Sequence, residues 1–205
     1  MFYTKEELKK IGFKSIGNNV LISDKCSIYG ADKIEIGSNV RIDDFVILSP
    51  GTSLKIGNYV HIACYASLIG KGEIIIEDFV GVSGRVSIYS STDDYLGFAL
   101  TNPMIPEKFK RVTNGKVHIK KHSVIGSGSV IMPNVTINMG VSVYAQSLVK
   151  TDCDELTIYA GTPCKKIKNK MTDFLELEKQ FLSEYPINQS PILVDDDDDD
   201  IIYVH

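Results

Sequence analysis

Large apolar residues recur at steps of six through most of the chain. Up to Ile88 three such steps repeat on a period of twenty residues, and beyond Lys116 the step of six continues without interruption. A helix would bring apolar residues back at three or four positions and a half-buried strand at two, so a period of six fits neither alone. A sustained hexapeptide repeat is typical of a parallel β-helix. The leading positions are Ile16, Ile22, Ile28, Ile36, Ile42, Leu48, Ile56, Ile62, Leu68, Ile76, Val82, Ile88, Ile119, Ile125, Ile131, Ile137, Val143 and Val149.

Each hexad has the composition that a narrow triangular interior requires. In Ile36–Arg41 and Ile56–His61 the first residue is isoleucine and the fifth is valine, while Gly37 and Gly57 stand second, where the chain turns a corner. Strands in stacked coils lie about 4.8 Å apart, so roughly seven coils would form a prism of about 30 to 35 Å. A sandwich of short strands shares this composition, but it has no reason to keep a phase of six residues.

The two ends differ from the repeat. Thr4 and Glu7 form a capping box and Gly12 is a stop, which predicts one helix within residues 1–15. The β-helix is expected over residues 16–170. Residues 171–205 are expected to form a C-terminal helix over Met171–Tyr185, covering the open end of the stack or packing on a neighbour, followed by an acidic tail.

Composition narrows the class of protein. With 205 residues and 43% hydrophobic content, the chain fits one domain. It has neither an apolar run of about 20 residues nor an apolar N-terminal stretch, so we expect a cytoplasmic protein without membrane insertion. The negative charge of the run Asp195–Asp200 is larger than the net charge of −4, and we assign this run no function. The four cysteines form no C-x-x-C pair, which favours reduced, structural thiols.

The repeat is interrupted once, after Ile88. Residues 89–116 (Tyr89 to Lys116) fall outside the hexad phase. A loop of this length in a compact domain is usually functional or disordered. The prolines and the aromatic residues in it, among them Tyr95 and Phe98, favour an ordered projecting loop.

Taken together, these features resemble the left-handed β-helix acetyltransferases that use acetyl-coenzyme A (acetyl-CoA). The resemblance covers roughly residues 1–180 and depends on the hexads, the excursion after Ile88 and the ending Tyr159-Ala160-Gly161-Thr162-Pro163-Cys164-Lys165. Left-handed winding is implied by the resemblance alone, because the usual crossover preference is right-handed.

Two branches of this superfamily compete. Galactoside and maltose O-acetyltransferases carry a catalytic histidine shortly after an I-Y-T-type strand, whereas here Ile88–Thr92 leads to Asp93. The chain more closely resembles acyltransferases of nucleotide-linked 4-amino-4,6-dideoxyglucose in surface-polysaccharide (O-antigen or capsule) synthesis, in Tyr3–Leu8, Asn58–Ala63, Ser90–Tyr95 and Leu100–Pro103. That branch implies N-acetylation of an amino-deoxysugar, with sugar O-acetylation as the alternative.

Acyl transfer from a thioester needs a group that removes the proton of the nucleophile. His61 is the sixth residue of its hexad, beside a corner, so its side chain can point outward and act as the base. Asp93 or Asp94, at the root of the excursion, is expected to orient His61 or to bind the substrate. Tyr95, Thr101 and Asn102 are expected to contact the sugar. The alternatives are a surface or packing role for the histidine and turn formation by the two acids.

The cosubstrate is expected near the C-terminal coils. Cys164–Lys170 holds four lysines and no acid, which suits the phosphates of acetyl-CoA. The resemblance places Ser147, Lys150, Thr162, Pro163 and Lys165 along the coenzyme groove, with backbone contacts from Gly126 and Ser127, and Lys166 belongs to the same lysine-rich segment.

Other classes of protein have weaker support. His61, His118 and His122 match the ligand count of a zinc lyase of the gamma carbonic anhydrase type, but their spacing differs from that family. A non-catalytic hexapeptide scaffold is a further alternative. No metal is expected. The sequence has no P-loop and no dinucleotide-type glycine motif, and nothing in it indicates nucleic-acid binding. A convex prism has no deep pocket, so we expect a homotrimer with sites between subunits.

Overall fold

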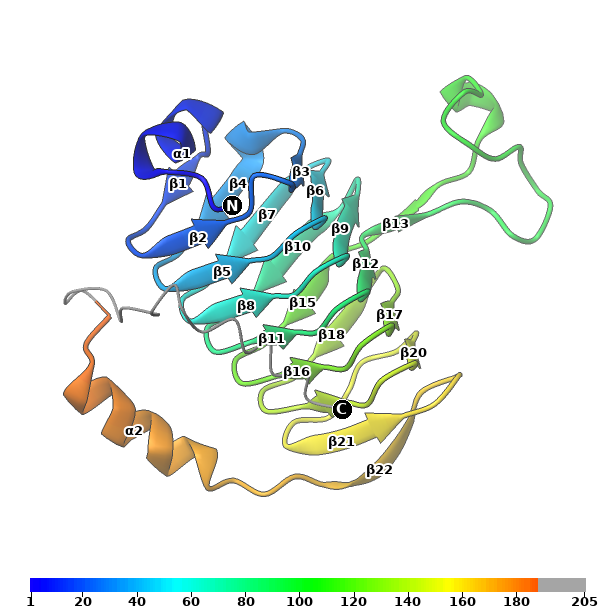
Figure 1. The fold of residues 1–205 in the computed structure, drawn as a ribbon. Helices are drawn as coiled ribbons and strands as arrows, with labels where there is room; N and C mark the ends of the chain where they lie inside the picture. The colour runs from blue at the N-terminus through cyan, green and yellow to red at the C-terminus, as the bar shows by residue number, and fades with distance from the viewer. Residues whose placement is uncertain (188–205) are drawn as a thin grey trace.

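The computed structural model describes residues 1–187, which form a triangular prism of stacked coils with one long projecting arm (Figure 1). Three parallel sheets make the faces, and successive coils add one strand to each in turn. The predicted parallel β-helix is therefore confirmed, and its coil is left-handed. The acidic run Asp195–Asp200 lies outside the described residues.

The strands divide among the three faces. The first sheet holds β1 (Ser15–Ile16), β4 (Ile34–Ile36), β7 (Ser53–Ile56), β10 (Glu73–Ile76), β15 (Val117–Ile119) and β18 (Val135–Ile137). The second holds β2 (Val20–Ile22), β5 (Val40–Ile42), β8 (Val60–Ile62), β11 (Gly81–Val82), β16 (Val124–Ile125), β19 (Ser142–Val143), β21 (Thr157–Ala160) and β22 (Lys165–Asn169). The third holds β3 (Ser27–Ile28), β6 (Ile47–Pro50), β9 (Ser67–Gly70), β12 (Ser87–Tyr89), β17 (Val130–Ile131) and β20 (Leu148–Val149).

The hexad positions form one continuous apolar column. From Ile36 to Val149 every leading residue has an exposed fraction of 4% or less. Ile16 and Ile28 are only partly buried, because the first coil has no coil above it. In three of the later hexads serine replaces valine at the fifth position, as Ser123, Ser129 and Ser147. Ser123 and Ser129 donate hydrogen bonds to the carbonyls of Asn138 and Tyr144, so these buried hydroxyls are satisfied.

Glycine serves the corners in a way that the sequence did not indicate. A Cβ on Gly37 would lie 2.6 Å from the Gly57 carbonyl oxygen, so glycine is needed for the close approach of successive coils. The left-handed backbone occurs two residues later, at Asn39, Tyr59 and Phe79, with φ of 59°, 55° and 58°. Such conformations are strained in aromatic residues, and packing between coils must hold them.

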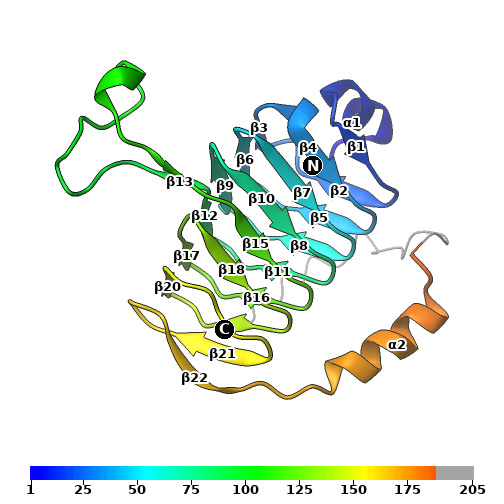
Figure 2. The same cartoon turned by 180° about the vertical axis from the view of Figure 1, so that it is seen from behind.

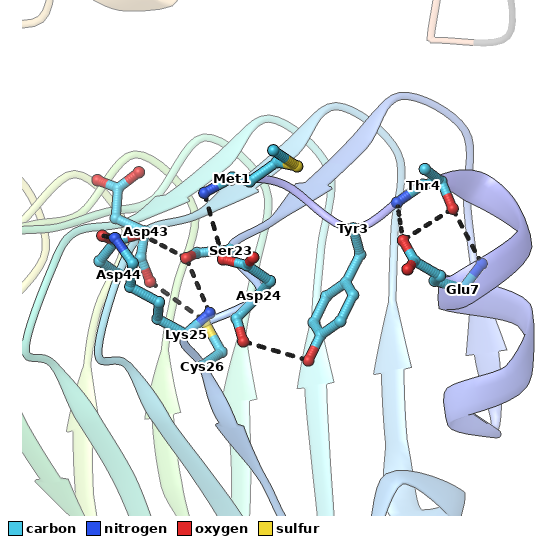
Figure 3. A network of polar contacts seen from close by, with 10 residues as sticks. All are labelled: Met1, Tyr3, Thr4, Glu7, Ser23, Asp24, Lys25, Cys26, Asp43 and Asp44. Atoms are coloured by element: carbon cyan, nitrogen blue, oxygen red, sulfur yellow. Dashed lines mark hydrogen bonds and ion pairs between the residues drawn. The ribbon is translucent and has the colours of Figure 1, made fainter.

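The N-terminal end is closed by α1 (Lys5–Ile11), with the predicted capping box and Gly12 as the stop. The Glu7 carboxylate accepts from the Thr4 backbone N–H at 2.8 Å, and the Thr4 hydroxyl accepts from the Glu7 N–H (Figure 3). Leu8 of this helix is 5% exposed and covers the first coil. A short 3₁₀ helix, η1 (Ala31–Lys33), follows β3.

The C-terminal end is closed by a hairpin instead of a helix. β22 turns back and pairs antiparallel with β21, so most of the lysine-rich segment is a strand, within the range expected for the β-helix. The expectation that the helix covers the open end is wrong in this chain. Here α2 (Phe174–Glu184) lies along the side of the prism (Figure 1).

The side position of α2 is fixed by an aromatic ladder at the corner between the first and second sheets. The rings of Tyr59, Phe79 and His122 stack with centroids 4.9 and 5.0 Å apart, and Phe181 of α2 meets Tyr59 edge-on at 5.1 Å. This ladder supplies the apolar surface that the amphipathic helix needs. Among residues 1–187, no helix has the length and apolar character needed to cross a bilayer.

An ion-pair cluster adds to the attachment of α2 and makes it sensitive to acid. His122 bonds to the Glu178 carboxylate at 2.8 Å, and Lys121 pairs with the same group. Burial raises the pKa of Glu178, but the hydrogen bonds from Lys121 and His122 outweigh it, so the pKa lies below its ordinary value of 4.5. The carboxylate therefore stabilises the fold fully above pH 4.5, and this contribution is lost as the pH falls through the lowered pKa.

Replacing Glu178 with glutamine tests this attachment. We expect Glu178→Gln to lower Tm by about 2 to 4 °C at pH 7, and the difference from the unaltered protein to shrink below about pH 4.5. Melting curves between pH 3 and 7 measure it. A Tm difference that stays constant over this range would contradict a role for the charged carboxylate.

The excursion forms an ordered arm that leaves the prism after the third sheet (Figure 2). Its root is the antiparallel pair β13 (Ser91–Thr92) and β14 (Thr113–Asn114), and its outer part contains the 3₁₀ helix η2 (Glu107–Phe109). Glu107 pairs with Lys71 of the prism at 3.0 Å. The arm exposes large apolar side chains, with exposed fractions of 87% for Tyr95 and 72% for Phe98.

The four cysteines, Cys26, Cys64, Cys153 and Cys164, are free thiols. Burial raises the pKa of Cys26 to about 11 and that of Cys153 to about 12. Both therefore stay protonated near neutral pH and act as small core residues rather than nucleophiles.

Candidate active site

His61 stands in a column of outward-facing residues on the second sheet. The register of the parallel strands places Arg41 on one side of it and Gly81 on the other, and the column continues through Val124 to Ser142. The His61 side chain is 52% exposed. The predicted outward direction of His61 is therefore confirmed.

A carboxylate holds the imidazole of His61. The His61 Nε2 atom lies 2.7 Å from Oδ2 of Asp43, at the corner that follows β5, and Arg41 Nε lies 2.7 Å from the other carboxylate oxygen. The Asp43 side chain is 20% exposed. Figure 3 shows Asp43 beside Ser23 and Asp44, close to the N-terminal segment. The side chains of His61, Asp43 and Arg41 thus form a hydrogen-bonded triad, in which the Asp43 carboxylate bridges the imidazole and the guanidinium.

The charge of Asp43 determines how the imidazole is protonated. Burial raises the pKa of Asp43, but hydrogen bonds from His61 and Arg41 outweigh it and hold the pKa below its ordinary value. An ionised carboxylate can only accept hydrogen bonds, so His61 must donate through Nε2. A neutral His61 then has the lone pair on Nδ1, which is available to take a proton from a nucleophile. This is the arrangement in which a carboxylate orients a catalytic histidine.

Asp93 and Asp94 lie elsewhere in the chain. The arm leaves after the third sheet, whereas His61 projects from the second. Within this chain the carboxylate that contacts His61 is therefore Asp43, and not the predicted Asp93 or Asp94. Asp94 accepts hydrogen bonds from the backbone N–H groups of Leu96 and Ala99, both at 2.9 Å, and the first of these lowers its pKa most. Asp93 receives one long bond of 3.4 Å from the Asn102 backbone. Asp94 therefore shapes the turn at the arm's root, while Asp93 is less engaged.

The three predicted sugar contacts also lie on the arm. Tyr95, Thr101 and Asn102 are exposed, and the backbone of Asn102 has a left-handed φ of 78°. The Asn102 side-chain carbonyl accepts from the Met104 N–H at 3.0 Å and so fixes this bend. All three residues are exposed on an arm that projects from the prism, so they are accessible to a molecule outside the chain.

The predicted coenzyme contacts gather at the C-terminal coils. Lys150, Lys165 and Lys166 are exposed, and Lys166 is 3.4 Å from Asp154. Thr162, next to Pro163, donates to the Gln146 carbonyl at 3.1 Å, so it holds the turn between β21 and β22. β22 is five strand steps from β8 in the second sheet, which at about 4.8 Å per step separates the lysines from His61 by about 24 Å.

Three members of this group have structural duties of their own. The Ser147 hydroxyl is buried, donates to the Tyr144 carbonyl at 2.7 Å and accepts from the Gly161 N–H at 3.0 Å. A Cβ on Gly126 would lie 2.5 Å from the Ala145 backbone nitrogen, so this glycine is required by the next coil. Ser127 lies at the same corner, where its carbonyl accepts from the Gln146 N–H.

The described part of the chain does not form the arrangement needed for a zinc lyase. His118 stands on the first sheet and bonds to Glu77 at 2.6 Å, while His122 is occupied by Glu178. Residues 1–187 contain no group of three potential metal ligands close enough to hold an ion.

A hollow bordered by charged groups lies on a different sheet from the His61 side chain. A groove of about 530 Å³ lies on the first sheet, lined by Glu35, Lys55, Asn58, Glu77 and Lys121 among others. None of the predicted site residues lines it. The surface around His61 is an open face, so a second molecule must enclose any ligand bound there.

Comparison with known proteins gives a consistent result. No family model matches the chain. A curated protein from Escherichia coli, the dTDP-4-amino-4,6-dideoxy-D-glucose acyltransferase, is 47% identical over 183 residues, covering 88% of this chain and 95% of that protein. The solved structure of AntD, an N-acyltransferase from Bacillus cereus in complex with dTDP and 3-hydroxybutyryl-CoA, is 50% identical with a TM-score of 0.87, covering 89% of this chain and 97% of the other.

A second AntD structure, of a variant with a serine replaced by alanine, holds dTDP-4-amino-4,6-dideoxyglucose and coenzyme A. It is 49% identical with a TM-score of 0.86, covering 89% of this chain and 98% of the other. The predicted resemblance is thus confirmed for nearly the whole described chain.

Proposed function

Because the chain belongs to the dTDP-4-amino-4,6-dideoxy-D-glucose acyltransferase family, we propose that it transfers an acyl group from a coenzyme A thioester to the amine of that nucleotide-linked sugar. The main observation behind this proposal is the similarity to AntD over almost the full length of both chains, since AntD was solved with this sugar nucleotide and with coenzyme A. We take acetyl as the acyl group and surface-polysaccharide synthesis as the setting. We place the enzyme in the cytoplasm, where nucleotide sugars and coenzyme A thioesters are made.

The chemistry is a direct transfer between two bound substrates. The sugar amine attacks the thioester carbonyl, the new C–N bond forms, and the C–S bond breaks with release of the coenzyme thiol. The amine proton moves to Nδ1 of His61, which passes it to the departing thiolate, while Asp43, itself paired with Arg41, holds the imidazole from its other side. An amine reaches its free-base form more easily than a hydroxyl does, so one histidine suffices without a second base.

Asp93 is the better candidate of the two arm carboxylates. Solved variants of AntD replace a serine and an aspartate ten positions apart in that enzyme. In this chain Ser83 and Asp93 have this spacing, whereas Gly84 and Asp94 do not supply the serine. Ser83 follows β11 at the same corner of the prism as Asp43, two coils further along, and was not singled out by the sequence patterns. We assign Asp93 to the sugar amine and Ser83 to the reacting centre.

A homotrimer would bring these groups together. Within one chain Ser83 and His61 lie at the second sheet, while Asp93 begins the arm beyond the third. The corner between these sheets carries an uncovered ladder in which Phe45 and Tyr65 stack at 5.0 Å with exposed fractions of 45% and 53%. The equivalent ladder at the corner between the first and second sheets, Tyr59–Phe79–His122, is covered by α2. The exposed apolar arm of a second subunit is the matching partner, and it would carry Asp93, Tyr95, Thr101 and Asn102 toward His61.

The lysines at the C-terminal coils are assigned to the phosphates of the coenzyme. We expect Lys165→Ala with Lys166→Ala to raise KM for acetyl-CoA by at least about 30-fold, since each of the two charge-assisted contacts is worth about 1 to 3 kcal/mol. The matched control is Lys9→Ala with Lys10→Ala, two adjacent exposed lysines at the opposite end of the prism. Equal KM values for both double variants would remove the assignment.

A thiol-release assay tests the proposed function. Purified protein is given acetyl-CoA or 3-hydroxybutyryl-CoA together with dTDP-4-amino-4,6-dideoxyglucose, with dTDP-glucose, or with a free galactoside. We expect release with the amino sugar nucleotide and formation of an amide. Release with the hydroxyl acceptors alone would show sugar O-acetylation instead and would overturn the proposal.

A further inference from the structure

Nothing in the backbone or packing of the prism requires glycine at position 81. It lies within β11, in regular parallel register with β8 on one side and β16 on the other. A Cβ built on Gly81 meets nothing within 4 Å, and its backbone is not in the left-handed region. Glycine inside a strand weakens the sheet, because it costs more conformational entropy than other residues and offers no side chain to pack.

Neither a bulge nor a tight contact between coils accounts for Gly81. The continuous register on both sides leaves no bulge at this position. No neighbouring coil approaches it closely, in contrast to Gly37, where a Cβ would lie 2.6 Å from backbone. The remaining reason is the close approach of a ligand from outside the prism.

The space above Gly81 has chemically distinct walls. His61 is its cross-strand neighbour on one side, and Val124, with an exposed fraction of 44%, is its neighbour on the other. Ser83 follows two residues later at the corner. The missing side chain thus leaves a shallow recess with a basic imidazole at one edge and two methyl groups at the other.

We propose that this recess holds the reacting end of the acyl acceptor and that Gly81 sets the size of what fits there, an inference that rests on the proposed acyltransferase function. The nucleophilic atom faces His61, and an apolar substituent next to it, such as the methyl group of a 6-deoxysugar, contacts Val124. A side chain at position 81 would occupy the same volume and displace the nucleophile from Nδ1. Gly81 is accordingly a specificity-determining residue for the acceptor and has no part in coenzyme binding.

A size series at position 81 tests this. Gly81→Ala and Gly81→Val are expected to fold with a Tm equal to or above that of the unaltered protein, because the φ at this position suits any residue. The kcat/KM for the amino sugar nucleotide should fall by about tenfold for alanine and by at least about 100-fold for valine, because moving a reacting atom by about 1 Å can lower the rate about 100-fold. KM for acetyl-CoA should stay within about twofold.

The control places the same side chain on an exposed strand position elsewhere. Ser15→Val, on β1 of the first sheet, should leave all kinetic constants unchanged. If the unaltered protein transfers an acyl group and Gly81→Val retains kcat/KM within about twofold, the inference is wrong while the proposed function stands. If Gly81→Val loses acetyl-CoA affinity instead of acceptor affinity, the recess belongs to the coenzyme and the inference is also wrong. If the unaltered protein transfers no acyl group to any acceptor, the proposed function fails first.

Discussion

Replacing His61 with alanine is expected to lower kcat by about 100- to 10,000-fold, the usual loss when a general base is removed. The imidazole is half exposed and contributes little to the core, so the variant should keep its Tm within about 2 °C. KM for acetyl-CoA should not change, because the lysines that we assign to the coenzyme lie five strand steps away in the second sheet. Steady-state kinetics with saturating dTDP-4-amino-4,6-dideoxyglucose measures the effect.

His118→Ala is the matched control, since this histidine also bonds to a carboxylate but stands on the first sheet. Its kcat should stay within about twofold of the unaltered value. Asp43→Asn should reduce kcat less than His61→Ala and leave both KM values unchanged, because the base remains but loses its fixed orientation. A His61→Ala enzyme with normal kcat on this acceptor would show that another group takes the proton.

The two neighbouring carboxylates of the arm are expected to differ sharply. Asp93→Asn should lower kcat/KM for the amino sugar by about 10- to 100-fold, the value of a charge-assisted hydrogen bond to the amine. Asp94→Ala should act by loosening the arm, because its carboxylate holds the N–H groups of Leu96 and Ala99. Kinetics combined with limited trypsin digestion separates the two effects, since the arm contains Lys108, Lys110 and Arg111.

Trypsin should cleave the arm of Asp94→Ala faster than that of the unaltered protein, and the arm of Asp93→Asn at the unaltered rate. An Asp93→Asn variant with equal kcat/KM for the sugar would exclude this residue from the site. Activity lost by Asp94→Ala alone, with no change in cleavage, would mean that Asp94 is the functional carboxylate and that the spacing argument chose the wrong acid.

The β-helix could be predicted from sequence because its hexads fix the core independently of any distant contact. Every leading residue from Ile36 to Val149 is buried, and the interruption after Ile88 marks the arm. The capping box of Thr4 and Glu7 is equally local, so α1 begins and ends where expected.

Contacts between coils were harder to predict. Asp43 lies one coil before His61, and their interaction depends on which corner each residue reaches and on how the side chains turn outward. The twenty-residue period pairs position 41 with position 61, so a search for acids one period before each histidine would have found Asp43 close to that register. The course of α2 along the Tyr59–Phe79–His122 ladder had no signal of this kind, since exposed aromatic residues at corners do not reveal what covers them.

The central claim is that His61 of one subunit and Asp93 of the next form one site, and mixed assemblies test it most directly. His61→Ala and Asp93→Asn subunits, each of much reduced activity, are co-expressed with different affinity tags, and assemblies that carry both tags are purified. A closed ring of three built from both variants has one junction at which both required residues are unaltered, so about one third of the unaltered activity should return. Mixed assemblies no more active than the two parents would place both residues in a site within one chain and would contradict the account.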